Sequence, residues 1–437
     1  MNIHFIGIGG IGVSALAQYY LSNGHKVSGS DLVSSEMTEL LKNKGIKIII
    51  GKHKIKNLSK NTNLVIYSPA VPEDNPELKI AQKNKIKCQS YPEALGDLTK
   101  KYFTIAISGT HGKSTTTAMT ALTLIKAGLD PTVILGTKLK EFKNSNFRKG
   151  KSKYLIIEAD EWKASFLNYF PQIIALTNIE REHLDYYKNI KHILKTYQEY
   201  INHLSKKGIL IINGKDKNIK RLISNSKHFS ILDFRSLKSK DIKKLKTILN
   251  VPGEYNVLNA SIALSIARIL KVPDKVSYQA LSIYKGAWRR FEEYKLKVGD
   301  FKLKIISDYA HHPTEIKVTL KALREKFPQK EIWCVFQPHQ YQRTFYLFKD
   351  FIKTFRQAIN KLKINKVIIT DIYDVAGREK KGLKNKINSE KLIKEINSPS
   401  AIYLPKNKIK KYLKKNAKGQ EVIIIMGAGD IYKVLDN

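Results

Sequence analysis

Short apolar segments alternate with amphipathic stretches along the whole chain, and glycines stand at many of the boundaries. Ile3 to Ile8 is apolar and runs into glycines, after which Ile11 to Asn23 has helical periodicity and ends before Gly24. Lys26 to Ser30 then predicts a second strand. Because regular alternation of strand, glycine turn and helix is typical of parallel sheets, we expect an α/β protein with mostly parallel sheets.

The same pattern continues to the end of the chain. Helical stretches are predicted at Ser114 to Ala127 and at Asn256 to Leu270. The further predicted strands are Leu64 to Ser68, Phe103 to Ile107, Tyr154 to Ile157, Ile173 to Leu176, Leu303 to Ile306, Ile332 to Phe336, Val367 to Thr370 and Val422 to Met426. At ~150 residues per domain, 437 residues suggest about three domains, which we place at residues 1–100, 101–292 and 293–437.

The composition is that of a globular protein, with 42% hydrophobic residues. No apolar run approaches the ~20 residues of a membrane span, and the N-terminus lacks the basic region of a secretion signal. Cys88 and Cys334 have no metal-ligand spacing, so we expect buried, inert thiols. These features predict a cytoplasmic protein without a membrane partner.

The formal net charge is +40, from 78 basic and 38 acidic residues. Nucleic-acid binding is one interpretation of this charge. The other is a lysine-rich surface that attracts anionic small substrates. Basic residues are spread along the chain, and no zinc-finger, homeodomain or RNA-binding signature accompanies them, so we favour the second interpretation and expect no nucleic-acid partner.

Gly7-Ile8-Gly9-Gly10-Ile11-Gly12 fits the pattern G-x-G-x-x-G between a predicted strand and a predicted helix, and Asp31 follows the second strand. Glycines let the backbone approach a pyrophosphate, the helix N-terminus supplies positive potential, and a carboxylate accepts a hydrogen bond from a sugar hydroxyl. NAD satisfies this pattern, and a UDP-sugar satisfies it equally. The alternative is a tight turn without a ligand.

Gly109-Thr110-His111-Gly112-Lys113-Ser114 resembles a P-loop that binds a nucleoside triphosphate and Mg²⁺. In such a loop backbone N–H groups surround the phosphates, a lysine contacts the β and γ oxygens, and a hydroxyl binds the metal. Lys113 and Ser114 fit the last two roles. The loop is shorter than G-x-x-x-x-G-K-[ST], because Ile107 stands where the first glycine would be, but a strand precedes it and a helix follows.

Polar clusters follow several later strands. Glu158-Ala159-Asp160-Glu161 could hold a metal or its waters, and His183 could be a further ligand, although a single histidine is more often structural. Asp308 to Pro313 and Gln337 to Thr344 follow two strands of the third segment. Since open α/β sheets bind ligands at the carboxyl ends of their strands, these two clusters predict a substrate pocket. For Arg343 alone, a surface salt bridge is an equal alternative.

Taken in order, these features resemble the Mur ligases over nearly the whole chain. The shortened P-loop is the form that this family uses. The matching strings are HFIGIGGIGVSALA (residues 4–17), GSD (29–31), SPAVPEDNPE (68–77), GTHGKSTTT (109–117), EADE (158–161), TNIEREHLDYY (177–187), VPGEYNVLNA (251–260), RRFE (289–292), DYAHHPTE (308–315), FQPHQYQRT (336–344) and GAGDI (427–431).

The resemblance implies a Rossmann-like UDP-binding domain, a central ATPase domain and a Rossmann-like C-terminal domain. It implies that ATP, with Mg²⁺, phosphorylates the carboxylate of UDP-N-acetylmuramate, and that the amine of L-alanine then displaces phosphate from the acyl phosphate. Positioning and charge stabilisation are the main contributions of the protein to such a reaction. The implied enzyme is an amide ligase of peptidoglycan precursor synthesis, acting as a monomer or weak dimer.

The resemblance also implies roles for individual residues. The catalytic residues would be Lys113, Glu158 and His183, and the metal ligands Ser114, Glu158 and His183. ATP would contact Gly109, Thr110, His111, Gly112, Lys113, Ser114, Thr115, Asn256, Asn259, Arg290 and Asp308. The UDP moiety would contact Gly9, Gly10, Ile11, Gly12, Ser14, Asp31 and Ser68. The amino acid would contact Tyr309, His311 and Arg343.

The chain departs from the family pattern at several positions. Ser114 replaces a threonine and conserves the hydroxyl, Tyr255 replaces a histidine, and Lys163 replaces an acidic or polar residue. Gln340 replaces the first arginine of Q-P-H-R-Y-x-R-T, which helps to bind the carboxylate of the amino acid. Glutamine cannot form a charged bidentate pair, so the identity of the amine is less certain than the ligase chemistry.

Three alternatives stay open. A recycling ligase would attach a preformed peptide to UDP-N-acetylmuramate, but that branch has a different string in place of residues 336–344. A nucleotide-dependent oxidoreductase would leave the Gly109 loop and the acidic cluster without a role. An inactive scaffold would not need Lys113, Glu158 and His183.

Overall fold

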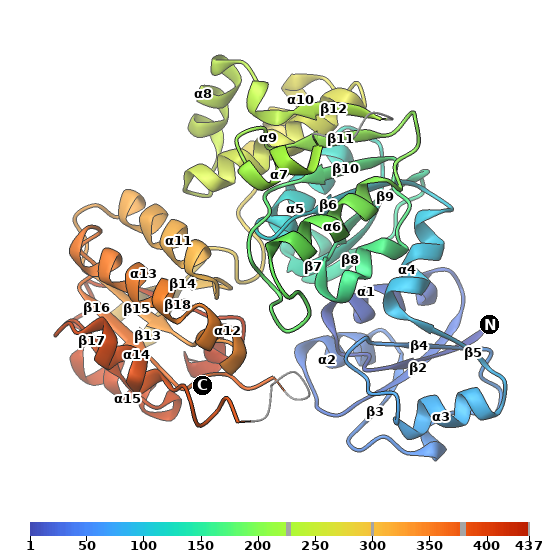
Figure 1. The fold of residues 1–437 in the computed structure, drawn as a ribbon, viewed down its shortest axis with the longest axis horizontal. Helices are drawn as coiled ribbons and strands as arrows, with labels where there is room; N and C mark the ends of the chain where they lie inside the picture. Colours follow the sequence, from blue (N-terminus) through green and yellow to red (C-terminus); the bar gives the residue numbers. More distant parts are fainter. Residues whose placement is uncertain (224–228, 299–300, 376–381, 436–437) are drawn as a thin grey trace. The chain divides into compact units, whose positions relative to one another are not determined.

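The computed structural model describes residues 1–223, 229–298, 301–375 and 382–435. Within these residues the strands form three sheets, of five, seven and six strands (Figure 1). Strand pairing is parallel except in two antiparallel ribbons. These are β7 (Thr132–Leu139) with β8 (Ser145–Arg148), and β13 (Glu292–Val298) with β14 (Phe301–Asp308). The predicted α/β architecture with mostly parallel sheets is therefore confirmed. Among the described helices, none is long and apolar enough to cross a membrane.

The first sheet is entirely parallel and has the order β3-β2-β1-β4-β5. Its strands are β1 (Asn2–Ile6), β2 (Lys26–Asp31), β3 (Lys47–Ile50), β4 (Leu64–Tyr67) and β5 (Lys87–Ser90). Its helices are α1 (Ile11–Ser22), α2 (Glu36–Asn43), α3 (Pro76–Lys83) and α4 (Tyr91–Thr99), and the 3₁₀ turn η1 spans Ile55–Asn57. The predicted strand Ile3 to Ile8 is two residues too long, because Gly7 has φ +74° and turns the chain.

The second sheet has the order β12-β11-β10-β6-β9-β7-β8. Its strands are β6 (Phe103–Ser108), β7 (Thr132–Leu139), β8 (Ser145–Arg148), β9 (Tyr154–Ala159), β10 (Ile173–Leu176), β11 (Ile209–Ile212) and β12 (Ser230–Asp233). The accompanying helices are α5 (Lys113–Lys126), α6 (Ile190–Ile201), α7 (Lys217–Ile223), α8 (Ser239–Ile248), α9 (Glu254–Ile269) and α10 (Asp274–Ser282). The 3₁₀ segments are η2 (Lys140–Phe142), η3 (Trp162–Asn168) and η4 (Phe234–Ser236).

The third sheet has the order β13-β14-β18-β15-β16-β17. Its strands are β13 (Glu292–Val298), β14 (Phe301–Asp308), β15 (Ile332–Phe336), β16 (Lys366–Ile369), β17 (Ala401–Tyr403) and β18 (Val422–Met426). Its helices are α11 (Pro313–Lys326), α12 (Tyr341–Tyr346), α13 (Phe348–Asn360), α14 (Ser389–Ile396) and α15 (Lys406–Asn416), followed by η5 (Ile431–Leu435).

The central strands of the third sheet are buried on both faces. Ile306 and Ile424 belong to one core cluster, whereas their neighbours Ile305 and Ile423 belong to another on the opposite face. Such strands appear in a sequence as continuous apolar runs, which is why β15 and β18 were predictable to the residue. Cys334 lies in the first cluster and is buried as expected, but Cys88 is only half-buried.

The chain divides into two compact units. The N-terminal unit comprises Met1–Glu180, Ile190–Ile248 and Leu258–Tyr284, and it contains the first two sheets. The C-terminal unit comprises Arg181–Asn189, Leu249–Val257 and Lys285–Asn437, and it contains the third sheet. The domain boundaries predicted after residues 100 and 292 remain predictions.

Candidate functional site

The Gly109 loop joins the buried strand β6 to helix α5, as predicted. Gly109 has φ +123°, and a Cβ there would lie 2.2 Å from the Thr177 hydroxyl. Gly112 has φ +84°, and a Cβ there would lie 2.6 Å from Oδ1 of Asn259. Both positions therefore require glycine for conformation and for space.

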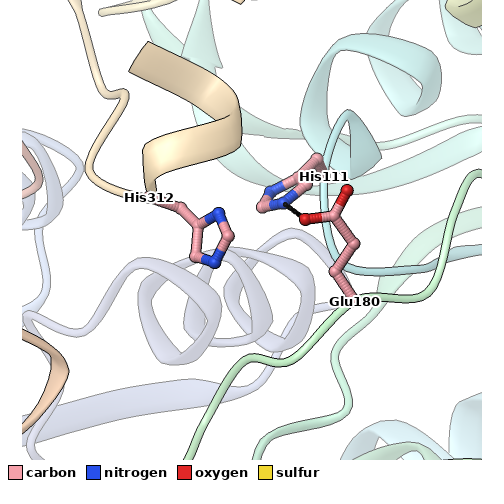
Figure 2. Close-up of side chains that lie close together, drawn as sticks. All are labelled: His111, Glu180 and His312. Atoms are coloured by element: carbon pink, nitrogen blue, oxygen red, sulfur yellow. Dashed lines mark ion pairs between the residues drawn. The ribbon is translucent and has the colours of Figure 1, made fainter. Parts of the chain in front are cut away.

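The segment after β10 supports this loop. The backbone N–H of Thr110 donates to the Asn178 carbonyl (2.9 Å), and that of His111 donates to Oδ1 of Asn178 (3.0 Å). The Thr177 hydroxyl donates to the His111 carbonyl (2.7 Å). The His111 ring faces the Glu180 carboxylate at 3.5 Å (Figure 2). Hydrogen bonds with Thr177 and Asn178 thus hold the loop in shape.

Lys113 lies at the first position of α5, and its ammonium group is held among carbonyl and carboxylate oxygens. Nζ donates to the Gly109 carbonyl (2.7 Å) and to Oε2 of Glu161 (2.9 Å), and it lies 3.6 Å from Oδ1 of Asp160. Burial alone would lower the pKa of Lys113, but the charges of Glu161 and Asp160 outweigh it and raise the pKa above its ordinary value. The lysine is therefore a permanent cation at the phosphate loop.

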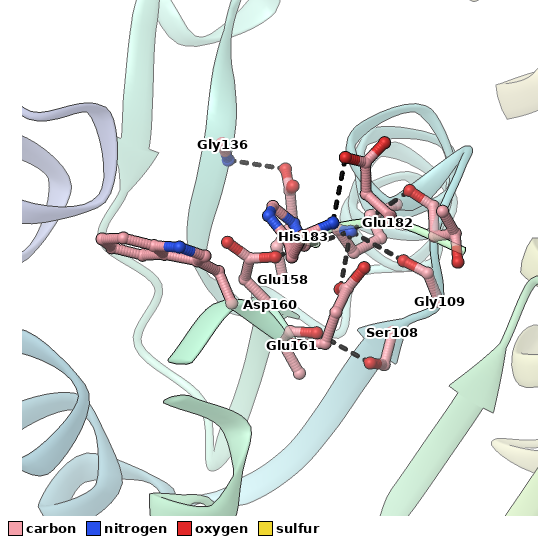
Figure 3. A network of polar contacts seen from close by, with 12 residues as sticks. Ser108, Gly109, Gly136, Glu158, Asp160, Glu161, Glu182 and His183 are labelled. Atoms are coloured by element: carbon pink, nitrogen blue, oxygen red, sulfur yellow. Dashed lines mark hydrogen bonds and ion pairs between the residues drawn. The ribbon is translucent and has the colours of Figure 1, made fainter. Parts of the chain in front are cut away.

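The structure brings together two of the three predicted metal ligands. The Ser114 hydroxyl donates to Oε2 of Glu158 at 3.0 Å. The other oxygen of Glu158 accepts from the backbone N–H of Gly136 at 2.5 Å (Figure 3). A Cβ at position 136 would lie 2.6 Å from the Glu158 carboxylate, so any larger residue there would displace that carboxylate. The third predicted ligand, His183, belongs to the C-terminal unit and has φ +53°.

The first glycine loop also has its predicted place, between β1 and α1. The N–H groups of Gly7 and Ile8 donate to the Ser30 carbonyl (2.9 and 3.1 Å), and the N–H of Gly9 donates to Oδ2 of Asp31 (2.8 Å). A Cβ on Gly12 would lie 2.7 Å from the Tyr91 ring. Asp31 is thus both a carboxylate at the end of β2 and a support for the loop.

The other residues predicted to contact UDP differ in accessibility. Gly10 is exposed and Ile11 is half-buried, so their backbone can be reached at the start of α1. Ser14 is fully buried, and its hydroxyl donates to the Ile11 carbonyl (2.9 Å). Ser68 is half-buried after β4, where its hydroxyl accepts from the N–H of Ala70 (3.3 Å). The predicted role of Ser14 can therefore involve its backbone more readily than its hydroxyl.

The residues predicted to contact adenine lie on α9 and are divided between the two units. Asn259 belongs to the N-terminal unit and accepts from the Thr116 hydroxyl at 3.2 Å. Asn256 belongs to the C-terminal unit and donates to the Pro252 carbonyl at 2.7 Å. Thr115, on the first turn of α5, is buried. These roles stay predictions.

Asp308, predicted to contact ATP, is buried at the end of β14. Its two oxygens accept from the N–H groups of Phe291 and Ala310, each at 2.8 Å. Burial raises the pKa of Asp308 to about 6, although the charge of Arg290 opposes the shift. The guanidinium of Arg290 lies 4.9 Å from the centre of the Tyr309 ring. Asp308 therefore holds the backbone next to Arg290, at Phe291, and next to Tyr309, at Ala310.

The three residues predicted to bind the amino acid lie in one cluster of the C-terminal unit. The Tyr309 and His311 rings are 5.4 Å apart, and the His311 and His339 rings are 5.8 Å apart. His339 in turn lies 2.9 Å from Nη1 of Arg343. Burial lowers the pKa of His311 to about 4, against the raising effect of Glu315, so His311 is a neutral ring at pH 7.

Arg343 forms a buried ion pair, not a surface salt bridge. Its Nε and Nη2 both donate to Oε1 of Glu182, at 3.0 and 2.8 Å. The side chains are only 8% and 9% exposed. Burial opposes ionisation of Glu182, but the charge of Arg343 keeps its pKa well below the ordinary value. Arg343 is predicted to bind the carboxylate of the amino acid, but in this structure it is paired with the carboxylate of Glu182.

Gln340, which replaces the expected arginine, immediately precedes α12 and is buried. It has φ +70°, and its N–H donates to the Tyr373 carbonyl at 2.9 Å. Gln340, Gln342, Arg343 and Glu182 line one small pocket of the C-terminal unit. Gln340 thus lies beside Arg343, one of the three residues predicted to bind the amino acid, and its part in that site stays a prediction.

Several residues of these clusters were not assigned roles from the sequence. Glu161 and Glu182 stand in recognised strings, but nothing in their spacing showed that they pair with Lys113 and Arg343. His339 stands in the string 336–344 and could have been proposed from its motif. Gly136 carries no local signal, because its role depends on the pairing of β7 with β9.

Comparison with known proteins shows that one family contains all of these segments in the same chain. The chain matches the family models Mur ligase family, catalytic domain (residues 2–103), Mur ligase middle domain (107–267) and Mur ligase, glutamate ligase domain (289–429). The chain belongs to the Mur ligase family. Its similarity to individual Mur ligases extends over almost its full length. It is 40% identical to the UDP-N-acetylmuramate--L-alanine ligase of Clostridium acetobutylicum, covering 99% of this chain and 96% of that protein.

Other relatives agree with this assignment. The UDP-N-acetylmuramate--L-alanine ligase of Clostridium tetani is 40% identical, with 100% of this chain and 97% of that protein covered. Among solved structures, UDP-N-acetylmuramate-alanine ligase MurC from Thermotoga maritima matches with a TM-score of 0.79 and 27% identity, over 99% of this chain and 97% of that one. A murein peptide ligase from Psychrobacter arcticus, at 23% identity and a TM-score of 0.73, shares the fold. The three-domain Mur ligase architecture expected from the motifs is thus confirmed.

Proposed function

We propose that this Mur ligase joins L-alanine to the carboxylate of UDP-N-acetylmuramate at the expense of ATP, through an acyl phosphate. The observation that carries the proposal is the joint presence of two phosphate-binding loops in one compact unit. The Gly7 loop suits the diphosphate of a nucleotide sugar, and the Gly109 loop suits a triphosphate. The UDP-N-acetylmuramate--L-alanine ligases of Clostridium acetobutylicum and Clostridium tetani are 40% identical to this chain over nearly its whole length.

The reaction needs ATP because a carboxylate is a poor electrophile. A carboxylate oxygen of the sugar substrate attacks the γ-phosphorus, the bond from that phosphorus to the bridging oxygen breaks, and ADP leaves. The amine then attacks the acyl carbon, and phosphate departs as the amide forms. Lys113 would exchange the carboxylate of Glu161 for phosphate oxygens and balance their negative charge, as a permanent cation can.

Ser114 and Glu158 fit a magnesium ion. A hydroxyl and a carboxylate oxygen are ligands that Mg²⁺ prefers, and they lie 3.0 Å apart. The bond from the Gly136 N–H orients the carboxylate of Glu158. A bound Mg²⁺ would neutralise phosphate charge during the transfer. His183 is proposed as a further ligand on the basis of its motif alone.

L-alanine is proposed as the amine because the relatives are UDP-N-acetylmuramate--L-alanine ligases and because Tyr309, His311 and Arg343 lie in one cluster. Gln340 favours one specific alternative, a different amine, because the position lacks the expected charge. A recycling ligase would use a preformed peptide in place of the amino acid. We expect the enzyme to act in the cytoplasm. We also expect a monomer or weak dimer, and size-exclusion chromatography with light scattering would test this oligomeric state.

The decisive experiment measures phosphate release from ATP in the presence of Mg²⁺, UDP-N-acetylmuramate and a panel of amines. We expect release that needs both the sugar nucleotide and L-alanine. The panel contains glycine, L-serine, L-alanine and the tripeptide of peptidoglycan. Release with the tripeptide alone would identify the recycling ligase. No release with any amine, combined with reduction of NAD, would overturn the ligase assignment.

A further inference from the structure

The side chain of Asn146 forms hydrogen bonds between the second sheet and helix α1, which begins after the Gly7 loop. Asn146 lies in β8 of the second sheet and is completely buried. Its amide nitrogen donates to the Ile11 carbonyl and to the Ser14 hydroxyl (3.0 Å), and its amide oxygen accepts from Nε2 of Gln18 (2.8 Å). One side chain therefore contacts three residues on the first two turns of α1.

Gln18 completes this network and is 2% exposed. Its Nε2 also donates to the Ser14 carbonyl (3.2 Å), and its Oε1 accepts from the hydroxyl of Ser145 (2.9 Å), the neighbour of Asn146 in β8. Two buried amides are thus hydrogen-bonded through both their nitrogen and their oxygen atoms. Such a network fixes one arrangement of the contacting elements, because any shift leaves a buried polar group unsatisfied.

The same β ribbon reaches the predicted metal site at its other strand. β8 pairs antiparallel with β7 through Ile134–Phe147 and Leu139–Ser145, and the register shifts between these pairs. Gly136 lies in that irregular stretch, where its N–H donates to Glu158. In this ribbon, β7 is therefore hydrogen-bonded to Glu158 and β8 is hydrogen-bonded to the start of α1.

We propose that Asn146 is a positioning residue, which sets the UDP-binding loop at a fixed distance from the metal ligand Glu158. The inference rests on the proposed function, because it assumes that the sugar nucleotide binds at the Gly7 loop. The Ile11 carbonyl and Ser14 lie in the first turn of α1, whose free N–H groups would face the diphosphate. Phosphoryl transfer needs the substrate carboxylate held in line with the γ-phosphate, so a displaced loop would misplace that carboxylate.

Asn146→Asp tests this role with little change in volume. A carboxylate cannot donate to the Ile11 carbonyl, so the bond is replaced by repulsion between two oxygens. We expect the Kd for UDP-N-acetylmuramate and for UDP, measured by calorimetry on the full chain, to rise about tenfold. The Kd for a non-hydrolysable ATP analogue should change less than about twofold, because Thr177, Asn178 and Asn259 support the Gly109 loop. The kcat at saturating substrates should fall at least about tenfold.

Ser145→Ala is the matched control. It removes the hydrogen bond to Gln18 and weakens the same domain contact, but it leaves the bond from Asn146 to Ile11. We expect a lower melting temperature with UDP affinity and kcat close to those of the wild type. This separates a loss of stability from a loss of positioning, because a purely structural role of Asn146 would change melting in both variants and nothing else.

The outcomes are distinguishable. Weaker UDP binding and lower kcat in Asn146→Asp, with ATP binding retained and Ser145→Ala near normal, would support the positioning role. Unchanged UDP affinity and kcat in Asn146→Asp would overturn it while leaving the proposed function intact. Equal loss in both variants would also overturn it, because the effect would then belong to the domain contact in general. A wild-type chain that binds no UDP-N-acetylmuramate would overturn both proposals.

Discussion

The ammonium of Lys113 donates to the carboxylate of Glu161 at 2.9 Å, and Glu161 is 2% exposed. Glu161 thus forms an ion pair with the lysine that, in a P-loop, contacts the β and γ phosphates. A buried ion pair loses much of its attraction to desolvation, so its exchange for phosphate oxygens need not be costly. The carboxylate holds the lysine in place, and we predict that Lys113 leaves it for phosphate oxygens when ATP binds.

Glu161→Gln should therefore lower the stability of the protein without nucleotide and raise its affinity for ATP. Without the carboxylate, the charge of Lys113 is left with the more distant Asp160 at 3.6 Å. We expect a lower melting temperature without nucleotide and a Kd for a non-hydrolysable ATP analogue lowered about three- to tenfold, which differential scanning fluorimetry and calorimetry would measure.

Asp160→Asn is the control for this prediction, because its side chain is 52% exposed and not within hydrogen-bonding distance of Lys113. It should change both quantities much less than Glu161→Gln does. Weaker ATP binding in Glu161→Gln would contradict the prediction and would show that Glu161 acts in the nucleotide-bound state instead.

Lys113→Ala should remove ATP-dependent amide formation while leaving UDP-N-acetylmuramate binding largely intact. The lysine supplies charge to the transferred phosphoryl group, and its loss should lower kcat at least about 10³-fold. Coupled phosphate-release assays and calorimetry with the sugar nucleotide check the two parts. Lys126→Ala, in the exposed last turn of the same helix, is the control. Turnover near the wild-type rate would exclude Lys113 from the reaction.

The elements and loops were predictable wherever the signal was local. The Gly7 and Gly109 loops were found because glycine positions, the preceding strand and the following helix are adjacent in the chain. The buried strands β15 and β18 were found because both faces are apolar. Weakly apolar edge strands such as β5, with the sequence KCQS, gave no such signal.

Contacts between distant segments were not predictable. Asn146 and Ile11 are 135 positions apart, and only the pairing of β8 with β7 and its packing on α1 bring them together. Arg343 and Glu182 are 161 positions apart, so the sequence could not decide between a surface salt bridge and a buried pair. Motifs could propose the residues of the site, whereas the partners that hold these residues depend on the tertiary fold.

Asp308 should make the stability of the C-terminal unit depend on pH. Its pKa of about 6 in the folded chain lies above the ordinary aspartate value of 3.8, so the folded state holds the proton more tightly than the unfolded state. Its contribution to stability is therefore full below pH ~4 and is lost as the pH rises to ~6. The free energy of unfolding of the wild type relative to Asp308→Asn should fall by about 3 kcal/mol between pH 4 and pH 7.

Urea unfolding followed by tryptophan fluorescence would measure this difference, because Trp288 and Trp333 both lie in the C-terminal unit. Asp430→Asn is a control of opposite sign. Burial would raise the pKa of Asp430, but Lys406 and Gln337 outweigh it and lower the pKa below the ordinary value. The wild type should therefore gain stability relative to Asp430→Asn as the pH rises through the acid range. A pH-independent difference for Asp308→Asn would contradict the prediction, because it would show that the pKa of Asp308 is the same in the folded and unfolded states.

The site predicted to bind the amino acid contains one arginine, Arg343, and the carboxylate of Glu182 balances its charge. Glu182 accepts from both Nε and Nη2 of Arg343, and Gln340 lines the same pocket without a charge. The carboxylate of an amino acid therefore meets a weaker positive potential here than two arginines would provide. This arrangement predicts a weakly bound L-alanine.

Gln340→Arg should then lower the KM for L-alanine, by about three- to tenfold, because a second guanidinium adds charge that Glu182 does not balance. Initial rates of phosphate release against L-alanine concentration measure the change, and the KM for ATP should stay the same. Gln357→Arg, which adds the same charge on α13 outside this pocket, controls for a general effect of charge. If the KM for L-alanine rises in Gln340→Arg while that for another amine of the panel falls, the pocket serves that amine, and glutamine at this position is a specificity determinant.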